Sequence, residues 1–197
     1  MRSRVAPLGL LLPLILGAGY AAAAEGDELL GTRPPEWTAE HWLSSEPLSL
    51  GDLRGRVVLV RFWTGPECPY CRASAPALNE WHERYADEGL TVVALYHHKG
   101  RGGADGADPE AVAAYAEELG FEFPVAIDPG WRTLRAWWLD GHSHGWTSVS
   151  FLLDRDGVIR HLHPGGQYVE GDTAHAELEA AIERLLAEPA GGKPGGP

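Results

Sequence analysis

Residues 57–71 read VVLVRFWTGPECPYC and join a strand-like run to two closely spaced cysteines. The first seven residues are aliphatic or aromatic apart from one arginine, which is typical of a strand buried on both faces of a sheet. The residues that follow predict an amphipathic helix, because apolar side chains recur there at steps of three and four. These side chains are Ala75, Leu78, Trp81 and Tyr85. Cys68 and Cys71 are therefore expected at a strand-to-helix junction.

The rest of the chain alternates between strand-like and helix-like segments. The further strands are expected at 91–96, 123–127, 150–154 and 158–163, and the further helices at 109–119, 131–138 and 178–186. A turn at 155–157 makes the last two strands a hairpin. This order predicts an α/β fold with a central mixed sheet and helices on both of its faces.

The two ends of the chain differ in composition from the middle. Residues 1–24 combine an arginine-containing start, an apolar centre and a final run of alanines, which indicates a secretory signal peptide or, alternatively, an uncleaved membrane anchor. Residues 25–45 are interpreted as a linker and N-terminal extension, of which 25–35 form a loosely attached polar linker, and 188–197 as a disordered Gly/Pro-rich tail. One folded domain is then expected over residues 46–187.

Composition limits the class of protein. The 197 residues include 16 basic and 28 acidic side chains, for a net charge of −12, and no basic run appears. This balance argues against nucleic acid as a partner. A domain of this length buries roughly 70% of its unfolded surface, so its core does not depend on a disulfide framework. The cysteines therefore need another explanation.

The spacing of Cys68 and Cys71 at the start of a helix favours redox chemistry. The first amides of a helix lack intrahelical partners, and the helix dipole places partial positive charge there, so a Cys68 thiolate is stabilised. Cys71, one turn further on, is expected to be more buried and to attack the mixed disulfide formed at Cys68. Two alternatives stay open: a structural disulfide, which would close only a four-residue ring, and half of a zinc site, which would need two more ligands.

Several motifs resemble the exported thioredoxin-like proteins of the TlpA type, which are disulfide oxidoreductases with a redoxin domain. The matching segments are LGDLRGRVVLVRFW at 50–63, CPYCR at 68–72, APAL at 75–78 and FLLDRDGVIR at 151–160. The resemblance implies a thioredoxin-like fold with Cys68 as nucleophile, Cys71 as resolving thiol and no cofactor or metal. It also implies protein thiols or disulfides as substrates, an upstream redox partner and a periplasmic or secreted location. We expect a monomer.

Two features depart from the pattern of this family. Ser148 stands where thioredoxins have a cis-proline beside the disulfide, which favours a trans Thr147–Ser148 bond over the alternative of a strained cis bond. Trp146, Thr147 and Ser148 are expected to form a substrate-docking loop. The buried acid that thioredoxins place shortly before the Phe-Trp pair is missing from residues 57–61. The glutamate that some exported relatives carry three residues after the second cysteine is replaced by Ser74.

Histidines offer another route for protons. Six of the nine fall in pairs, at 97/98, 142/144 and 161/163, and the expected topology brings all three pairs to the sheet edge near the cysteines. We hypothesise that His97, His98 or His163 transfers protons or adjusts a thiol pKa. The plain alternative is that these are exposed loop residues without a role. The alternative function is a copper-handling, metallochaperone-like module that uses Cys68, Cys71 and a nearby histidine.

Overall fold

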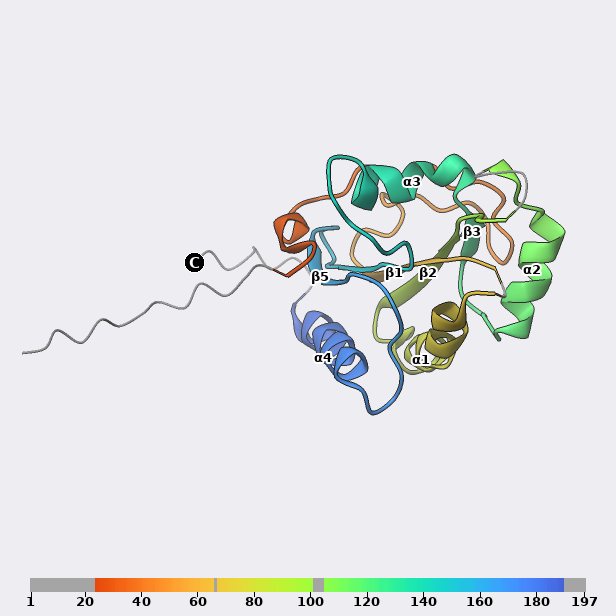
Figure 1. The fold of residues 1–197 in the computed structure, drawn as a ribbon. Helices are drawn as coiled ribbons and strands as arrows, with labels where there is room; N and C mark the ends of the chain where they lie inside the picture. Colours follow the sequence, from red (N-terminus) through yellow and green to blue (C-terminus); the bar gives the residue numbers. More distant parts are fainter. Residues whose placement is uncertain (1–23, 66, 101–104, 190–197) are drawn as a thin grey trace, which may run out of the picture.

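The computed structural model describes residues 24–65, 67–100 and 105–189. They contain one five-stranded sheet with the order β3-β2-β1-β4-β5 (Figure 1). The strands are β1 (Val57–Trp63), β2 (Leu90–Tyr96), β3 (Val125–Ile127), β4 (Ser150–Leu153) and β5 (Ile159–His163). β2 pairs in parallel with both β1 and β3, whereas β4 pairs antiparallel with both β1 and β5. The predicted mixed sheet is confirmed.

Helices cover both faces of this sheet. The longer ones are α1 (Pro69–Tyr85), α2 (Pro109–Glu118) and α4 (Thr173–Ala187). The short helical turns are η1 (Asp27–Leu29), η3 (Pro129–Trp131), α3 (Arg132–Leu134) and the π-helical η4 (Arg135–Leu139). Figure 1 shows α1 and α4 on one side of the sheet and α3 on the other. No helix among the described residues is long and apolar enough to cross a bilayer.

β1 lies at the centre of the sheet and is buried along its whole length. Because side chains alternate between the faces of a strand, Leu59 and Trp63 join the core beneath α1, while Val60 and Phe62 join the core on the α3 side. Arg61 alternates with Val60 and Phe62, which places it on the α1 face. The continuous apolar run that predicts this strand therefore serves two cores.

The N-terminal segment corrects one expectation. Residues 25–45 are expected to lie outside the folded domain as a linker and N-terminal extension, but side chains of this segment pack on the α3 side of the fold. Trp37 is buried and stacks on Trp137 with ring centroids 6.3 Å apart. Glu40 and Ile127 exchange two backbone hydrogen bonds of 2.8 Å, which extends the β3 edge. The physical reason is that this segment covers apolar surface that the short helical turns leave open.

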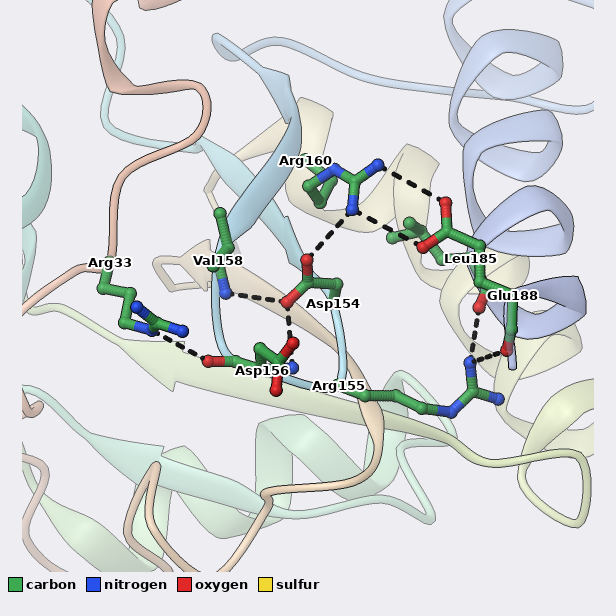
Figure 2. A network of polar contacts seen from close by, with 8 residues as sticks. All are labelled: Arg33, Asp154, Arg155, Asp156, Val158, Arg160, Leu185 and Glu188. Atoms are coloured by element: carbon green, nitrogen blue, oxygen red, sulfur yellow. Dashed lines mark hydrogen bonds and ion pairs between the residues drawn. The ribbon is translucent and has the colours of Figure 1, made fainter. Parts of the chain in front are cut away.

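A polar network joins the β4–β5 turn to the end of α4 (Figure 2). Arg155 Nη1 donates to the carbonyls of Leu185 at 2.6 Å and Glu188 at 2.8 Å, where the last carbonyls of a helix lack intrahelical partners. Arg160 forms ion pairs with Asp154 and Glu188. The hairpin thus holds α4 in place. Residues 1–23 of the predicted signal peptide and 190–197 of the predicted tail lie outside the described residues.

Candidate active site

Cys68 and Cys71 form a disulfide at the N-terminus of α1, with Cα atoms 5.4 Å apart. Cys68 is the N-cap residue, and its Sγ accepts a hydrogen bond of 3.2 Å from the amide of Cys71. Pro69 follows at the first helical position, where a missing N–H costs no hydrogen bond. Cys71 is 3% exposed whereas Cys68 is only partly buried, so the expected order of burial is confirmed. An attacking group from outside therefore reaches Cys68 first.

A cleft of about 730 Å³ opens at Cys68. Residues from three parts of the chain line it: the segment before α1, the residues after β2, and the loop before β4 that contains Trp146, Thr147 and Ser148. Tyr70 and Trp146, both exposed, face each other edge to face with ring centroids 5.4 Å apart. Exposed aromatic pairs of this kind offer rigid apolar contact area to a partner. The cleft thus presents two exposed aromatic rings together with Cys68.

The predicted docking loop is held from beneath by Arg61. Its guanidinium is buried and donates to the carbonyl of Ser148, to Ser150 Oγ at 3.2 Å and to the carbonyl of Gly166 at 2.9 Å. It also lies over the ring of Tyr168, 5.0 Å from its centroid. Sequence reasoning missed this role, although a single charged residue in a buried strand was the signal.

Ser148 is itself fixed on two sides. Its carbonyl accepts from Arg61, and its Oγ accepts a 3.2 Å hydrogen bond from the amide of Gly166. The described backbone contains no cis peptide bond, so the expected trans Thr147–Ser148 bond is confirmed. Side-chain and guanidinium hydrogen bonds thus hold the position where thioredoxins use a proline.

The structure corrects part of the prediction that three histidine pairs lie near the cysteines. All nine histidines lie in the described residues, and of these only His98 lines the cleft, where its Nδ1 is 3.1 Å from the hydroxyl of Tyr96. His97 packs between the rings of Phe62 and Trp131, on the α3 side, because consecutive residues point to opposite faces. His163 packs against Tyr168 with ring centroids 5.2 Å apart. The pairs at 142/144 and 161/163 do not line the cleft at Cys68.

Burial keeps two of these histidines neutral. Desolvation, followed by the charges of Lys99 and Arg61, lowers the pKa of His97 to about 3. Desolvation, followed by Arg61 and His161, lowers the pKa of His163 to about 4. Neither ring therefore gains a proton readily near neutral pH, which is unfavourable for a proton relay.

The low pKa of His97 predicts a stability loss in acid. The folded state binds fewer protons than the unfolded state, so stability is full above about pH 6.5 and falls as the pH drops towards the folded pKa. His97 alone contributes a slope of about 1.4 kcal/mol per pH unit between pH 6 and 4. Urea unfolding of wild type and His97→Leu at pH 6 and at pH 4 measures this slope. Parallel pH dependence in the two proteins would contradict this assignment.

Within residues 24–65, 67–100 and 105–189, no buried acid is seen to replace the one missing from the sequence motif. Asp128 is the one carboxylate that is fully buried among the described residues. Its oxygens accept from the amides of Thr133 at 2.8 Å and Leu134 at 2.9 Å, so it caps a short helix rather than serving a thiol. Ser74, which stands at the alternative acid position, is buried and accepts from the amide of Tyr168 at 3.2 Å.

Comparison with known proteins identifies the family. The family model described as Redoxin matches residues 31–182, which is most of the chain. The chain belongs to the Redoxin family. The match begins inside the N-terminal segment that packs on the sheet, which agrees with that segment being part of the Redoxin fold.

Two curated relatives and one solved structure are similar to this Redoxin chain over most of its length. Protein DipZ of Mycobacterium tuberculosis is 31% identical over 171 residues, which are 85% of this chain but 22% of DipZ, so the chain spans about a fifth of that relative. Thiol-disulfide oxidoreductase ResA of Bacillus anthracis is 29% identical over 143 residues, covering 73% of this chain and 71% of ResA. A crystal structure of a thiol-disulfide isomerase from Corynebacterium glutamicum has a TM-score of 0.60 at 28% identity, covering 79% and 97% of the two chains. Other matching solved structures are described as thioredoxin-like, so the predicted thioredoxin-like fold is confirmed.

Proposed function

We propose that this chain is a thiol-disulfide oxidoreductase that exchanges two electrons with protein thiols or disulfides through Cys68 and Cys71. The observation that carries the proposal is the disulfide at the N-terminus of α1, open to the cleft at Cys68 and buried at Cys71. The names of ResA and of the Corynebacterium structure support the same chemistry.

The geometry gives each sulfur a separate role. In the reducing direction, the Cys68 thiolate attacks a substrate disulfide, forms a mixed disulfide and releases one substrate thiolate. The Cys71 thiolate then attacks Cys68 Sγ, which closes the Cys68–Cys71 disulfide and releases the second substrate thiolate. The substrate gains two electrons and the protein dithiol loses two; the reverse sequence oxidises a substrate. The amide of Cys71 that reaches Cys68 Sγ favours the thiolate there.

Equilibration with glutathione buffers tests the redox couple directly. The fraction of Cys68–Cys71 disulfide, measured by thiol alkylation and mass spectrometry, is expected to follow a two-electron transition that is independent of protein concentration. A pair that stays oxidised across the whole buffer range would instead indicate a structural disulfide.

Proton transfer is assigned to His98. It is the histidine that lines the cleft with Cys68, and its Nδ1 lies 3.1 Å from the Tyr96 hydroxyl, which orients the ring. His98→Ala is expected to slow insulin reduction about tenfold and to change the shape of its pH profile between pH 5 and 9. His161→Ala, a histidine outside the cleft, is the matched control. Equal profiles for wild type and His98→Ala would remove His98 from the mechanism.

We place the enzyme outside the cytoplasm, where its electrons come from an upstream redox partner. The support is the signal-like composition of residues 1–24 and the resemblance to exported proteins. Fractionation of cells that express the full chain tests this location, and recovery only with cytoplasmic markers would contradict it. The copper-handling alternative is not favoured, because the curated relatives ResA and YkuV are named thiol-disulfide oxidoreductases. Stoichiometric Cu(I) binding that depends on His98 would revive it.

A further inference from the structure

Glu28, His142 and His144 form a cluster outside the Cys68 cleft, here called the His–Glu cluster. One potential ligand atom from each residue lies within 4.8 Å of the other two. Glu28 Oε1 is 3.0 Å from His142 Nδ1 and 3.2 Å from His144 Nε2. Glu28 belongs to η1, and the two histidines belong to the loop between η4 and β4. The cluster therefore joins segments that are far apart in the sequence.

His144 is held in the orientation of a ligand. Its Nδ1 is 2.6 Å from the carbonyl oxygen of Trp138. A carbonyl only accepts hydrogen bonds, so Nδ1 carries the hydrogen, and in the neutral ring Nε2 presents its lone pair to Glu28. The ring also stacks on Trp138 with centroids 3.5 Å apart, and its side chain is 7% exposed. Such a backbone partner on the second nitrogen is what fixes histidines that bind metals.

Glu28 Oε1 and His144 Nε2 face each other and need a proton or a cation between them. A neutral His144 directs a lone pair at a carboxylate oxygen 3.2 Å away, and two acceptors at that distance repel each other. Either a second proton on His144 or a cation relieves this. His142 stacks parallel to His144, with ring centroids 4.8 Å apart, and brings a second nitrogen to the same oxygen. Two imidazole nitrogens and a carboxylate oxygen thus converge on one point, which is the donor set that a single cation can share.

The spacing fits a small tetrahedral ion. Zinc bound at 2.0–2.1 Å by nitrogen and oxygen separates neighbouring ligand atoms by about 3.3 Å. The two separations from Glu28 Oε1, 3.0 and 3.2 Å, are close to that value. The two histidine nitrogens lie within 4.8 Å of each other, so ion binding would draw the partly exposed His142 towards His144. The donor set of two imidazoles and one carboxylate suits zinc-like ions rather than Mg²⁺ or Ca²⁺.

We propose that Glu28, His142 and His144 bind one zinc-like divalent cation, with water as the fourth ligand. The ion would link the N-terminal segment to the loop that continues into Trp146 and Ser148. That loop is already tied at two nearby points, because Gly145 donates to Glu25 at 3.2 Å and Trp138 Nε1 donates to the Trp146 carbonyl at 2.7 Å. The bound ion thus clamps the rim of the Cys68 cleft. The proposal does not depend on the redox function.

Calorimetric titration of the metal-free, oxidised protein with Zn²⁺ tests the site, because the disulfide prevents the cysteines from competing. One equivalent is expected to bind to wild type. Glu28→Gln, which keeps the shape but removes the charge, and His142→Ala are each expected to weaken binding at least about tenfold. His161→Ala is the matched control and is expected to bind as wild type does. No one-to-one binding, or equal affinity in all four proteins, would overturn the site.

Hydrogen exchange tests the clamp separately. Zn²⁺ is expected to slow amide exchange in residues 139–149 of wild type and to leave Glu28→Gln unchanged. Exchange that slows equally in Glu28→Gln would place the ion elsewhere. Binding without any slowing in wild type would show that the ion does not clamp the loop, and would contradict that part of the proposal.

Discussion

Cys68→Ser is expected to reduce the turnover of insulin disulfides at least about a thousandfold, because a serine hydroxyl does not ionise near neutral pH and cannot form a mixed disulfide. Cys68 is the sulfur that lines the cleft, so no other thiol of the chain meets a substrate in its place. The measurement is the rate of insulin precipitation with dithiothreitol as the reductant.

The loss of the disulfide itself needs a control. A bridge that closes a four-residue ring stabilises a fold by about 2 kcal/mol. Urea unfolding of reduced wild type and of Cys68→Ser is therefore expected to give similar midpoints, which separates lost chemistry from lost stability. A Cys68→Ser protein that retains more than about a tenth of the wild-type rate would contradict the assignment of the nucleophile.

Arg61→Met is expected to lower the free energy of unfolding by about 3 kcal/mol, because it leaves the buried acceptors at Ser148 and Ser150 and the partly buried Gly166 carbonyl without the Arg61 donor. Methionine has a similar length and fills the space, so the change tests the hydrogen bonds rather than packing. Arg61→Lys keeps a charge but offers no planar fork, and an intermediate loss is expected. The measurement is the urea midpoint of the oxidised proteins.

The same variants are expected to affect substrate docking. Arg61 holds the Ser148 carbonyl, so its loss frees the loop that lines the cleft and raises the KM for a protein disulfide more than it lowers kcat.

Arg135→Met is the control for the loss of stability. It removes an exposed arginine paired with Asp140, and the free energy of unfolding is expected to change by less than about 0.5 kcal/mol. An unchanged midpoint in Arg61→Met would show that the buried guanidinium does not hold the loop.

Local patterns predicted most of the fold. The apolar run at 57–63 and the steps of three and four after Pro69 gave β1 and α1 because burial imposes those periods directly on the sequence. Long-range contacts were harder. The packing of Trp37 on Trp137 joins positions 100 residues apart, and a polar segment between prolines carries no period that indicates it.

The candidate site was predicted in outline and missed in detail. Cys68 and the loop of Trp146, Thr147 and Ser148 meet at one cleft, as expected from strand ends that share a sheet edge. The histidines separated because neighbours on an extended chain point to opposite faces, which sends His97 into the core and His98 to the cleft. Applying that alternation to His97 and to Arg61 would have predicted their faces.

The central claim is that Cys68 forms a mixed disulfide which Cys71 resolves. The most direct measurement is mass spectrometry of Cys71→Ser recovered from cells after acid quenching and thiol alkylation, with the Cys68→Ser/Cys71→Ser double variant as control. The account predicts a protein thiol bound to Cys68 that dithiothreitol releases, and none in the double variant. A Cys71→Ser protein whose Cys68 is recovered only as a free alkylated thiol would contradict it.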